Sequence, residues 1–181
     1  MNTQVLPTRL ARLLAIAGGL AYTVEGAIVS RAPQGDEHWH ASGYAVEGAF
    51  VIALLATIPL LPLLATNASK NGRIATRLSQ LGFTAMLGSA AASLAIGGTT
   101  LGPAFLLGVL SAVVGLIALS VSAIRSRTSN SWRAPLVLVG LVLSMALGDH
   151  GGGLLFGLAW IGISIALRDR AEPHALVTAS A

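Results

Sequence analysis

Long apolar stretches separated by short polar segments run along almost the whole chain. We predict helices for these stretches, which occupy residues 9–30, 43–66, 74–97, 103–124, 134–149 and 152–168. Each of the first four has about 20 or more residues, which at ~1.5 Å per residue is enough to cross a ~30 Å hydrocarbon core. The pattern therefore predicts an all-α integral membrane protein.

The last two stretches are shorter than the others. Each has about 16 residues, which makes a helix of only ~24 Å. Gly148–Gly153, with the sequence GDHGGG, joins them and is typical of a tight turn. Two arrangements fit this pattern, a short helical hairpin whose tip lies below the outer membrane surface and a re-entrant pair. Both return the C-terminus to the side from which the pair starts.

Basic residues are concentrated in alternate connections. Ten of the eleven lie on one side of the predicted bundle, namely Arg9, Arg12, Lys70, Arg73, Arg77, Arg125, Arg127, Arg133, Arg168 and Arg170. The other side has only Arg31. Because Lys and Arg are retained on the cytoplasmic side, we predict a six-transmembrane-helix bundle of three helical hairpins in the cytoplasmic (plasma) membrane, with both termini cytoplasmic. Residues 1–168 form one polytopic domain, and 169–181 a polar, disordered cytoplasmic tail.

Composition agrees with this class. The 181 residues are 54% hydrophobic and only 10% charged, whereas soluble domains carry about a quarter charged residues. The net charge of +4 is spread over short loops, so it favours membrane orientation over nucleic-acid binding. The sequence has no cysteine, which excludes a thiol nucleophile or an iron–sulfur cluster. The lipid bilayer is thus the first predicted partner.

Small residues recur at helical spacing within the apolar stretches. Gly153 and Gly157 form a GxxxG pair, and Ala85, Ser89, Ser93 and Gly97 follow one another at intervals of four. Small residues allow helix backbones to approach closely in lipid. We predict that these faces pack within the bundle, with a homo-oligomer as the alternative.

Two apolar stretches contain nearly the same phrase around a glutamate. AYTVEGAIV at Ala21–Val29 contains Glu25, and GYAVEGAFV at Gly43–Val51 contains Glu47. The two helices run in opposite directions and each glutamate lies near its outer end, so both carboxylates are expected at similar depth. An inverted repeat would place equivalent positions at opposite depths. The repeated phrase therefore predicts a pair of carboxylates near the outer face.

A tyrosine precedes each glutamate by three residues. Tyr22 and Glu25, like Tyr44 and Glu47, share a helix face. We expect each phenol to donate a hydrogen bond to its carboxylate. Burial in apolar surroundings then favours the protonated form of one or both acids.

Two further polar groups fall on the predicted outer side. The loop residues Asp36, Glu37, His38 and His40 are candidate ligands for zinc, copper or iron, although the His-x-His motif is weak and a solvated loop is the favoured explanation. Asp149 and His150 stand at the tip of the last hairpin, where they either join the two glutamates or belong only to a turn.

These residues favour an outward-facing polar site for a small or lipid-like ligand or a metal. One alternative is a non-catalytic accessory or scaffold subunit of a larger membrane complex, in which the Glu–Tyr pairs lock helices together. A second alternative is a proton-coupled transporter subunit. Neither a mid-span histidine for haem nor an intramembrane lysine for retinal is present. No nucleophile elbow, HExxH motif or phosphate-binding loop assigns a reaction.

Overall fold

The computed structural model describes residues 7–31, 41–65, 70–97, 102–127 and 130–168. These residues form six α-helices and two short 3-10 segments. The helices are α1 (Thr8–Val29), α2 (Ala41–Thr57), α3 (Lys70–Ile96), α4 (Pro103–Ser126), α5 (Arg133–Leu147) and α6 (Gly152–Arg168). The 3-10 segments are η1 (Ile58–Leu64), which continues α2, and η2 (Gly148–His150), which lies between α5 and α6.

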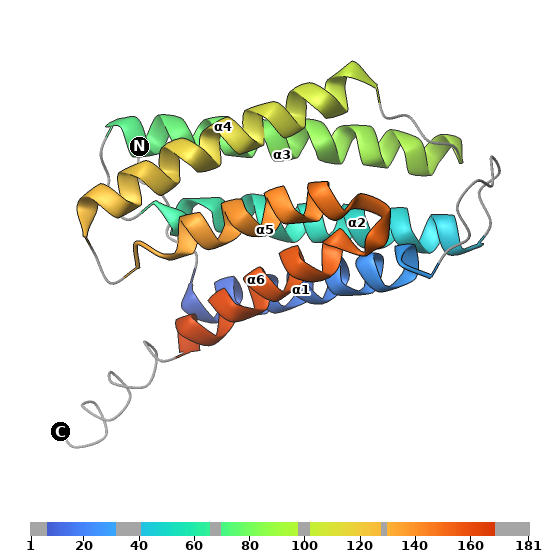
Figure 1. Ribbon diagram of the computed structural model, residues 1–181, viewed down its shortest axis with the longest axis horizontal. Helices are drawn as coiled ribbons and strands as arrows, with labels where there is room; N and C mark the ends of the chain where they lie inside the picture. Colours follow the sequence, from blue (N-terminus) through green and yellow to red (C-terminus); the bar gives the residue numbers. More distant parts are fainter. Residues whose placement is uncertain (1–6, 32–40, 66–69, 98–101, 128–129, 169–181) are drawn as a thin grey trace.

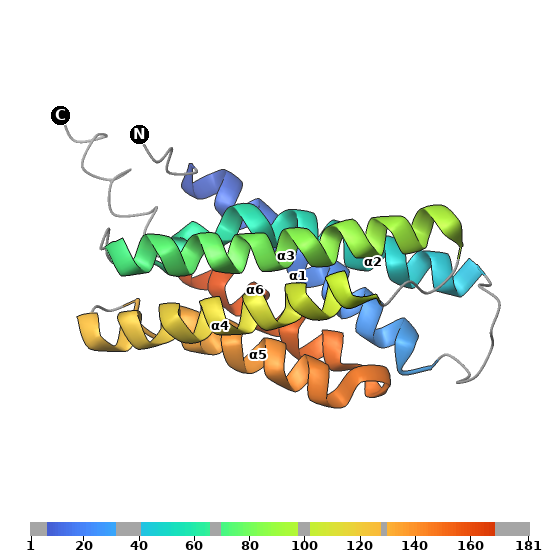
Figure 2. The same cartoon turned by 90° about the horizontal axis from the view of Figure 1, so that it is seen from above.

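The six helices form one elongated bundle in which neighbours along the chain run in opposite directions (Figures 1 and 2). Each helix packs against the next, and α6 closes the ring by packing on α1. The contact of α1 with α6 is more extensive than its contact with α2. Helix α1 begins and helix α6 ends at the same end of the bundle, as an even number of passes requires.

The predicted helices are confirmed, with bounds that differ from the expected ones by a few residues. Four of them are long and apolar enough to cross a membrane, while α5 and α6 are shorter apolar helices. The turn between α5 and α6 stops short of the end of the bundle that α2 and α3 reach (Figure 1). The chain is therefore a helical bundle of membrane type with a short last hairpin. The number of crossings and the orientation stay predictions.

Two prolines convert the second half of the second apolar stretch into the 3-10 segment η1. Pro59 and Pro62 lack backbone N–H groups and clash with the preceding helical turn. Without an N–H at Pro62, the Ile58 carbonyl has no donor four residues ahead. The side-chain amide of Gln80 on α3 donates to this carbonyl at 3.4 Å. A polar side chain in an apolar region thus compensates for a proline on a neighbouring helix.

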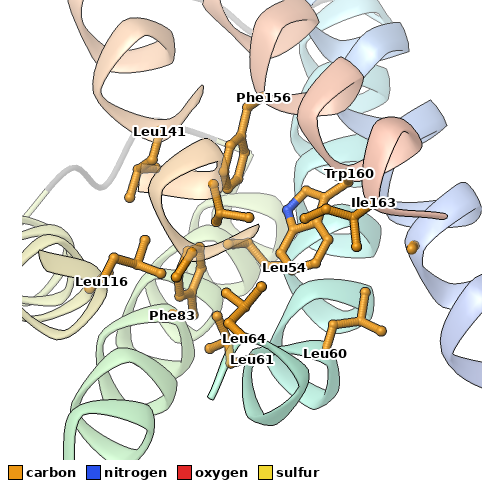
Figure 3. Close-up of a cluster of buried hydrophobic side chains, with 14 of the residues drawn as sticks. Leu54, Leu60, Leu61, Leu64, Phe83, Leu116, Leu141, Phe156, Trp160 and Ile163 are labelled. Carbon is orange, nitrogen blue, oxygen red and sulfur yellow. The ribbon is translucent and has the colours of Figure 1, made fainter. Parts of the chain in front are cut away.

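Aromatic rings occupy the middle of the bundle. The Tyr22 ring meets Phe156 edge-on at 4.6 Å between centroids, and Phe156 meets Trp160 at 6.4 Å. The Phe83 ring lies parallel to that of Phe156, also at 6.4 Å between centroids. Figure 3 shows Trp160 and Phe156 among the leucines of this cluster. The core therefore joins α1, α3 and α6 through the ring of Phe156.

Glycines bring α1 and α6 into backbone contact. A Cβ built on Gly19 would lie 2.8 Å from the Gly157 carbonyl oxygen. One built on Gly26 would lie 3.0 Å from the Gly153 carbonyl carbon. This confirms that the predicted Gly153/Gly157 pair packs within the bundle, as close approach in lipid requires.

Candidate functional site

Glu25 lies where α1 meets the first turn of α6. Its Oε2 atom occupies the space that a Cβ at Gly153 would need, and its Cδ would be 3.1 Å from that Cβ. The backbone around Gly26 packs against Gly151 and Leu154 at the same level. The N-terminal turn of a helix carries partial positive charge from its free N–H groups, so this position favours a carboxylate. Glu25 is half-buried there.

Glu47 on α2 lies near enough to Glu25 for the two carboxylates to interact electrostatically. It is also half-buried. Among the described residues, neither carboxylate lies against the positively charged group of a Lys or Arg. The two acids of the repeated phrase therefore form a pair, and the charge of that pair is not balanced within the described part of the chain.

The Tyr22 hydroxyl does not form the expected hydrogen bond with Glu25. Tyr22 is 2% exposed, and its hydroxyl lies near the Thr57 hydroxyl on α2. Neither oxygen has a hydrogen bond of ordinary geometry within the described residues. Side chains on a helix lean toward its N-terminus, so a long tyrosine at position 22 carries its hydroxyl away from position 25. Sharing a helix face did not bring the two polar groups together.

Tyr44 differs from Tyr22 in its surroundings. It is 46% exposed, and its hydroxyl lies against Gly97 at the C-terminal end of α3. Gly97 has a φ of +69°, which favours glycine, and a Cβ there would collide with the tyrosine hydroxyl. Tyr44 thus connects α2 to α3 near the end of the bundle, one turn from Glu47.

The remaining predicted site residues are described only in part. His150 is exposed in the turn between α5 and α6, while the side chain of Asp149 lies outside what the structure describes. Asp36, Glu37, His38 and His40 all fall outside the described residues, so the metal prediction made for them stays untested. Within the described residues, no group of three or more His, Asp or Glu side chains comes together.

Sequence reasoning missed two polar residues in the core, Thr57 and Trp160. Thr57 is 1% exposed and directly precedes η1, and its position two residues before Pro59 was the available signal. Trp160 is also 1% exposed. Its position in the middle of an apolar stretch distinguishes it from Trp132, which stands at the start of α5 and is 42% exposed. Tryptophans in membrane proteins concentrate at the interfaces, so a central one marks a special environment.

Chemically, two half-buried carboxylates held close together can bind a positively charged group or retain a proton. Comparisons with protein-family models, with curated proteins and with solved structures found no match.

Proposed function

We propose that this chain is a multi-pass membrane protein that uses Glu25 and Glu47 to bind the cationic group of a small or lipid-like ligand at its outer face. The observation that carries the proposal is that two half-buried carboxylates lie near each other on α1 and α2, and within the described residues no Lys or Arg lies against either. Like charges held close together in a medium of low dielectric constant repel strongly. A bound cation would remove this repulsion and supply the missing opposite charge.

The predicted topology places this pair on the outer side. Ten of the eleven basic residues lie in the segments assigned to the cytoplasm, which predicts that the connection between α1 and α2 is outside. Glu25 lies six residues before Arg31, and Glu47 lies six residues after the start of α2 at Ala41. Both carboxylates then lie ~5–10 Å inside the outer boundary, a depth that a lipid head group or an amphiphile can reach.

The short last hairpin supports access to the pair. Because the turn between α5 and α6 stops short of the bundle end (Figure 1), the first turn of α6 lies at the level of Glu25, with Gly153 against the carboxylate. Asp149 and His150 stand in the preceding turn. We include them, with Tyr44, as candidate residues at the rim of the site.

A matched pair of amphiphiles tests this function. The full chain in nanodiscs of zwitterionic lipid is heated with dodecylammonium or with dodecan-1-ol, which has the same alkyl chain without the charge. Unfolding is followed by tryptophan fluorescence. Occupancy at about 100 times the dissociation constant stabilises a protein by about 2.7 kcal/mol. We therefore expect dodecylammonium to raise the unfolding temperature by several degrees more than the alcohol.

Two variants show whether this stabilisation comes from the pair. The Glu25→Gln/Glu47→Gln protein keeps the side-chain shapes. In this variant dodecylammonium and the alcohol should raise the unfolding temperature equally. Glu172→Gln removes an acid from the C-terminal tail, and in this variant dodecylammonium should still raise the unfolding temperature more than the alcohol does. Equal effects of the two amphiphiles on the wild-type chain would overturn the proposed function.

A second candidate function is the accessory or scaffold role. The specific observation in its favour is the contact between the Glu25 carboxylate and Gly153, which holds the short hairpin against α1. In that role Glu25 would stabilise the fold and bind nothing. The thermal experiment separates the two functions, because a purely structural glutamate lowers the unfolding temperature when replaced but gives no preference for the charged amphiphile.

A further inference from the structure

Three polar atoms lie in the core between α1, α2 and α6 without a hydrogen-bond partner among the described residues. They are the Tyr22 hydroxyl, the Thr57 hydroxyl and the Trp160 indole N–H. Their side chains are at most 2% exposed. A buried polar group without a partner costs about 1–3 kcal/mol, so three such groups in one core need an explanation.

Thr57 stands out from the other helical hydroxyls of the bundle. Thr23, Thr76 and Ser120 each donate to the carbonyl four residues before, at 2.8, 2.8 and 2.7 Å. This is the usual way for a hydroxyl to be satisfied within a membrane helix. The Thr57 hydroxyl makes no such bond and faces the Tyr22 hydroxyl instead. Its orientation therefore indicates a polar partner away from its own helix.

The contacts of the three side chains indicate that their polar atoms lie in the same part of the core. Tyr22 and Thr57 face each other across α1 and α2. The Tyr22 ring packs on Phe156, and Trp160 follows Phe156 by one helical turn on α6. Since α6 runs antiparallel to α1, this turn leads in the direction in which the Tyr22 hydroxyl leans. Figure 3 shows Trp160 inside the cluster together with Leu54, which lies one turn before Thr57 on α2.

We propose that Tyr22, Thr57 and Trp160 bind one internal water molecule in the middle of the bundle. The hydrogen-bonding capacities match, because an indole N–H only donates while each hydroxyl both donates and accepts. A water can accept from Trp160 and from one hydroxyl and donate to the other hydroxyl. Three bonds are typical of a structural water, and polar partners distinguish such a site from a dry apolar cavity. The site is independent of the carboxylate pair.

Nuclear magnetic resonance on the full chain in nanodiscs tests this site. The indole Hε1 proton of Trp160, assigned by its loss in Trp160→Phe, should show a cross-relaxation peak to water with the sign of a long-lived contact. Trp132 provides an internal control, because it is 42% exposed and should show only short-lived surface hydration.

Single and double variants separate a bound water from a direct bond to one hydroxyl. In Tyr22→Phe and in Thr57→Val the water keeps two partners, so each single variant should retain the peak at Trp160. The double variant leaves one partner and should lose it. If Trp160 instead bonded directly to one hydroxyl, one single variant would abolish the peak. That result, or a wild-type chain with no water contact at Trp160, would overturn the proposal.

Discussion

The carboxylate of Glu25 lies beside Gly153, in the space that the Cβ of any other residue at position 153 would occupy. This contact places an acid of α1 against the first turn of α6, a helix more than a hundred positions later in the chain. It explains why a glycine follows the tight turn at this point. It also makes the position of the last hairpin depend on Glu25.

Replacing Gly153 should therefore separate α6 from α1. In Gly153→Ala the new methyl group meets the Glu25 carboxylate and, at 2.8 Å, the Tyr22 carbonyl oxygen. Overpacking of this kind costs about 1–3 kcal/mol. We expect a loss of that size in the free energy of unfolding, measured by steric trapping in bicelles.

Gly162 supplies the matched control on the same helix. A Cβ at Gly162 has no neighbour within 4 Å among the described residues, so Gly162→Ala should be neutral or stabilising by up to about 1 kcal/mol. Equal effects of the two alanine substitutions would contradict the close contact between α1 and α6.

The bond from Gln80 to the Ile58 carbonyl gives a second prediction. Gln80→Leu removes the side-chain donor and leaves this carbonyl only the 3-10 backbone N–H three residues ahead, so it should destabilise the bundle by about 1 kcal/mol or less. In a Pro62→Ala background the new N–H at residue 62 can donate to the same carbonyl. The cost of Gln80→Leu should then fall to nearly zero. A double-mutant cycle measured by thermal unfolding checks this, and strictly additive effects would show that Gln80 does not compensate for Pro62.

The distribution of basic residues gives a third prediction, on topology. A fluorescent protein fused after Ala181 should be fluorescent in a bacterial host, because that end is predicted to be cytoplasmic. Alkaline phosphatase inserted between Arg31 and Ala41 should be active, since this connection is predicted to be outside. An inactive phosphatase together with a dark fusion protein would reverse the orientation.

The helices could be predicted from the sequence because the signal is local. Apolar length and the breaks at Gly102–Pro103 and Gly148–Gly153 locate α4 and the α5–α6 turn within a few residues. The pairing of Glu25 with Glu47 was also within reach, since antiparallel helices with equivalent positions near one end must bring them to similar depth.

The directions in which side chains point could not be predicted from these local patterns. Tyr22 and Glu25 share a face, yet the tilt of a long side chain takes the phenol toward Thr57. Similarly, α3 and α4 come into backbone contact where Gly82 faces Ala112 and where Gly115 faces Ser79. None of these residues belongs to the predicted Ala85–Gly97 series. Which small residue is used depends on the partner helix and its crossing geometry, which spacing along one helix does not specify.

The most direct test of the central claim asks whether the Glu25–Glu47 pair is negatively charged and accessible from the outer side of the membrane. The sequence contains no cysteine, and a Cβ at Gly48 has open space among the described residues, so Gly48→Cys provides a single thiol at the position next to Glu47 in the chain. Its reaction rates with a cationic and an anionic methanethiosulfonate of similar size are compared in intact cells and in inverted membrane vesicles.

We predict faster labelling from outside and a rate ratio that favours the cationic reagent. The ratio should fall severalfold when Glu25→Gln and Glu47→Gln are added, because the pair no longer attracts the cation. Faster labelling from the cytoplasmic side, or a ratio unchanged by the loss of both carboxylates, would contradict an outward-facing anionic site.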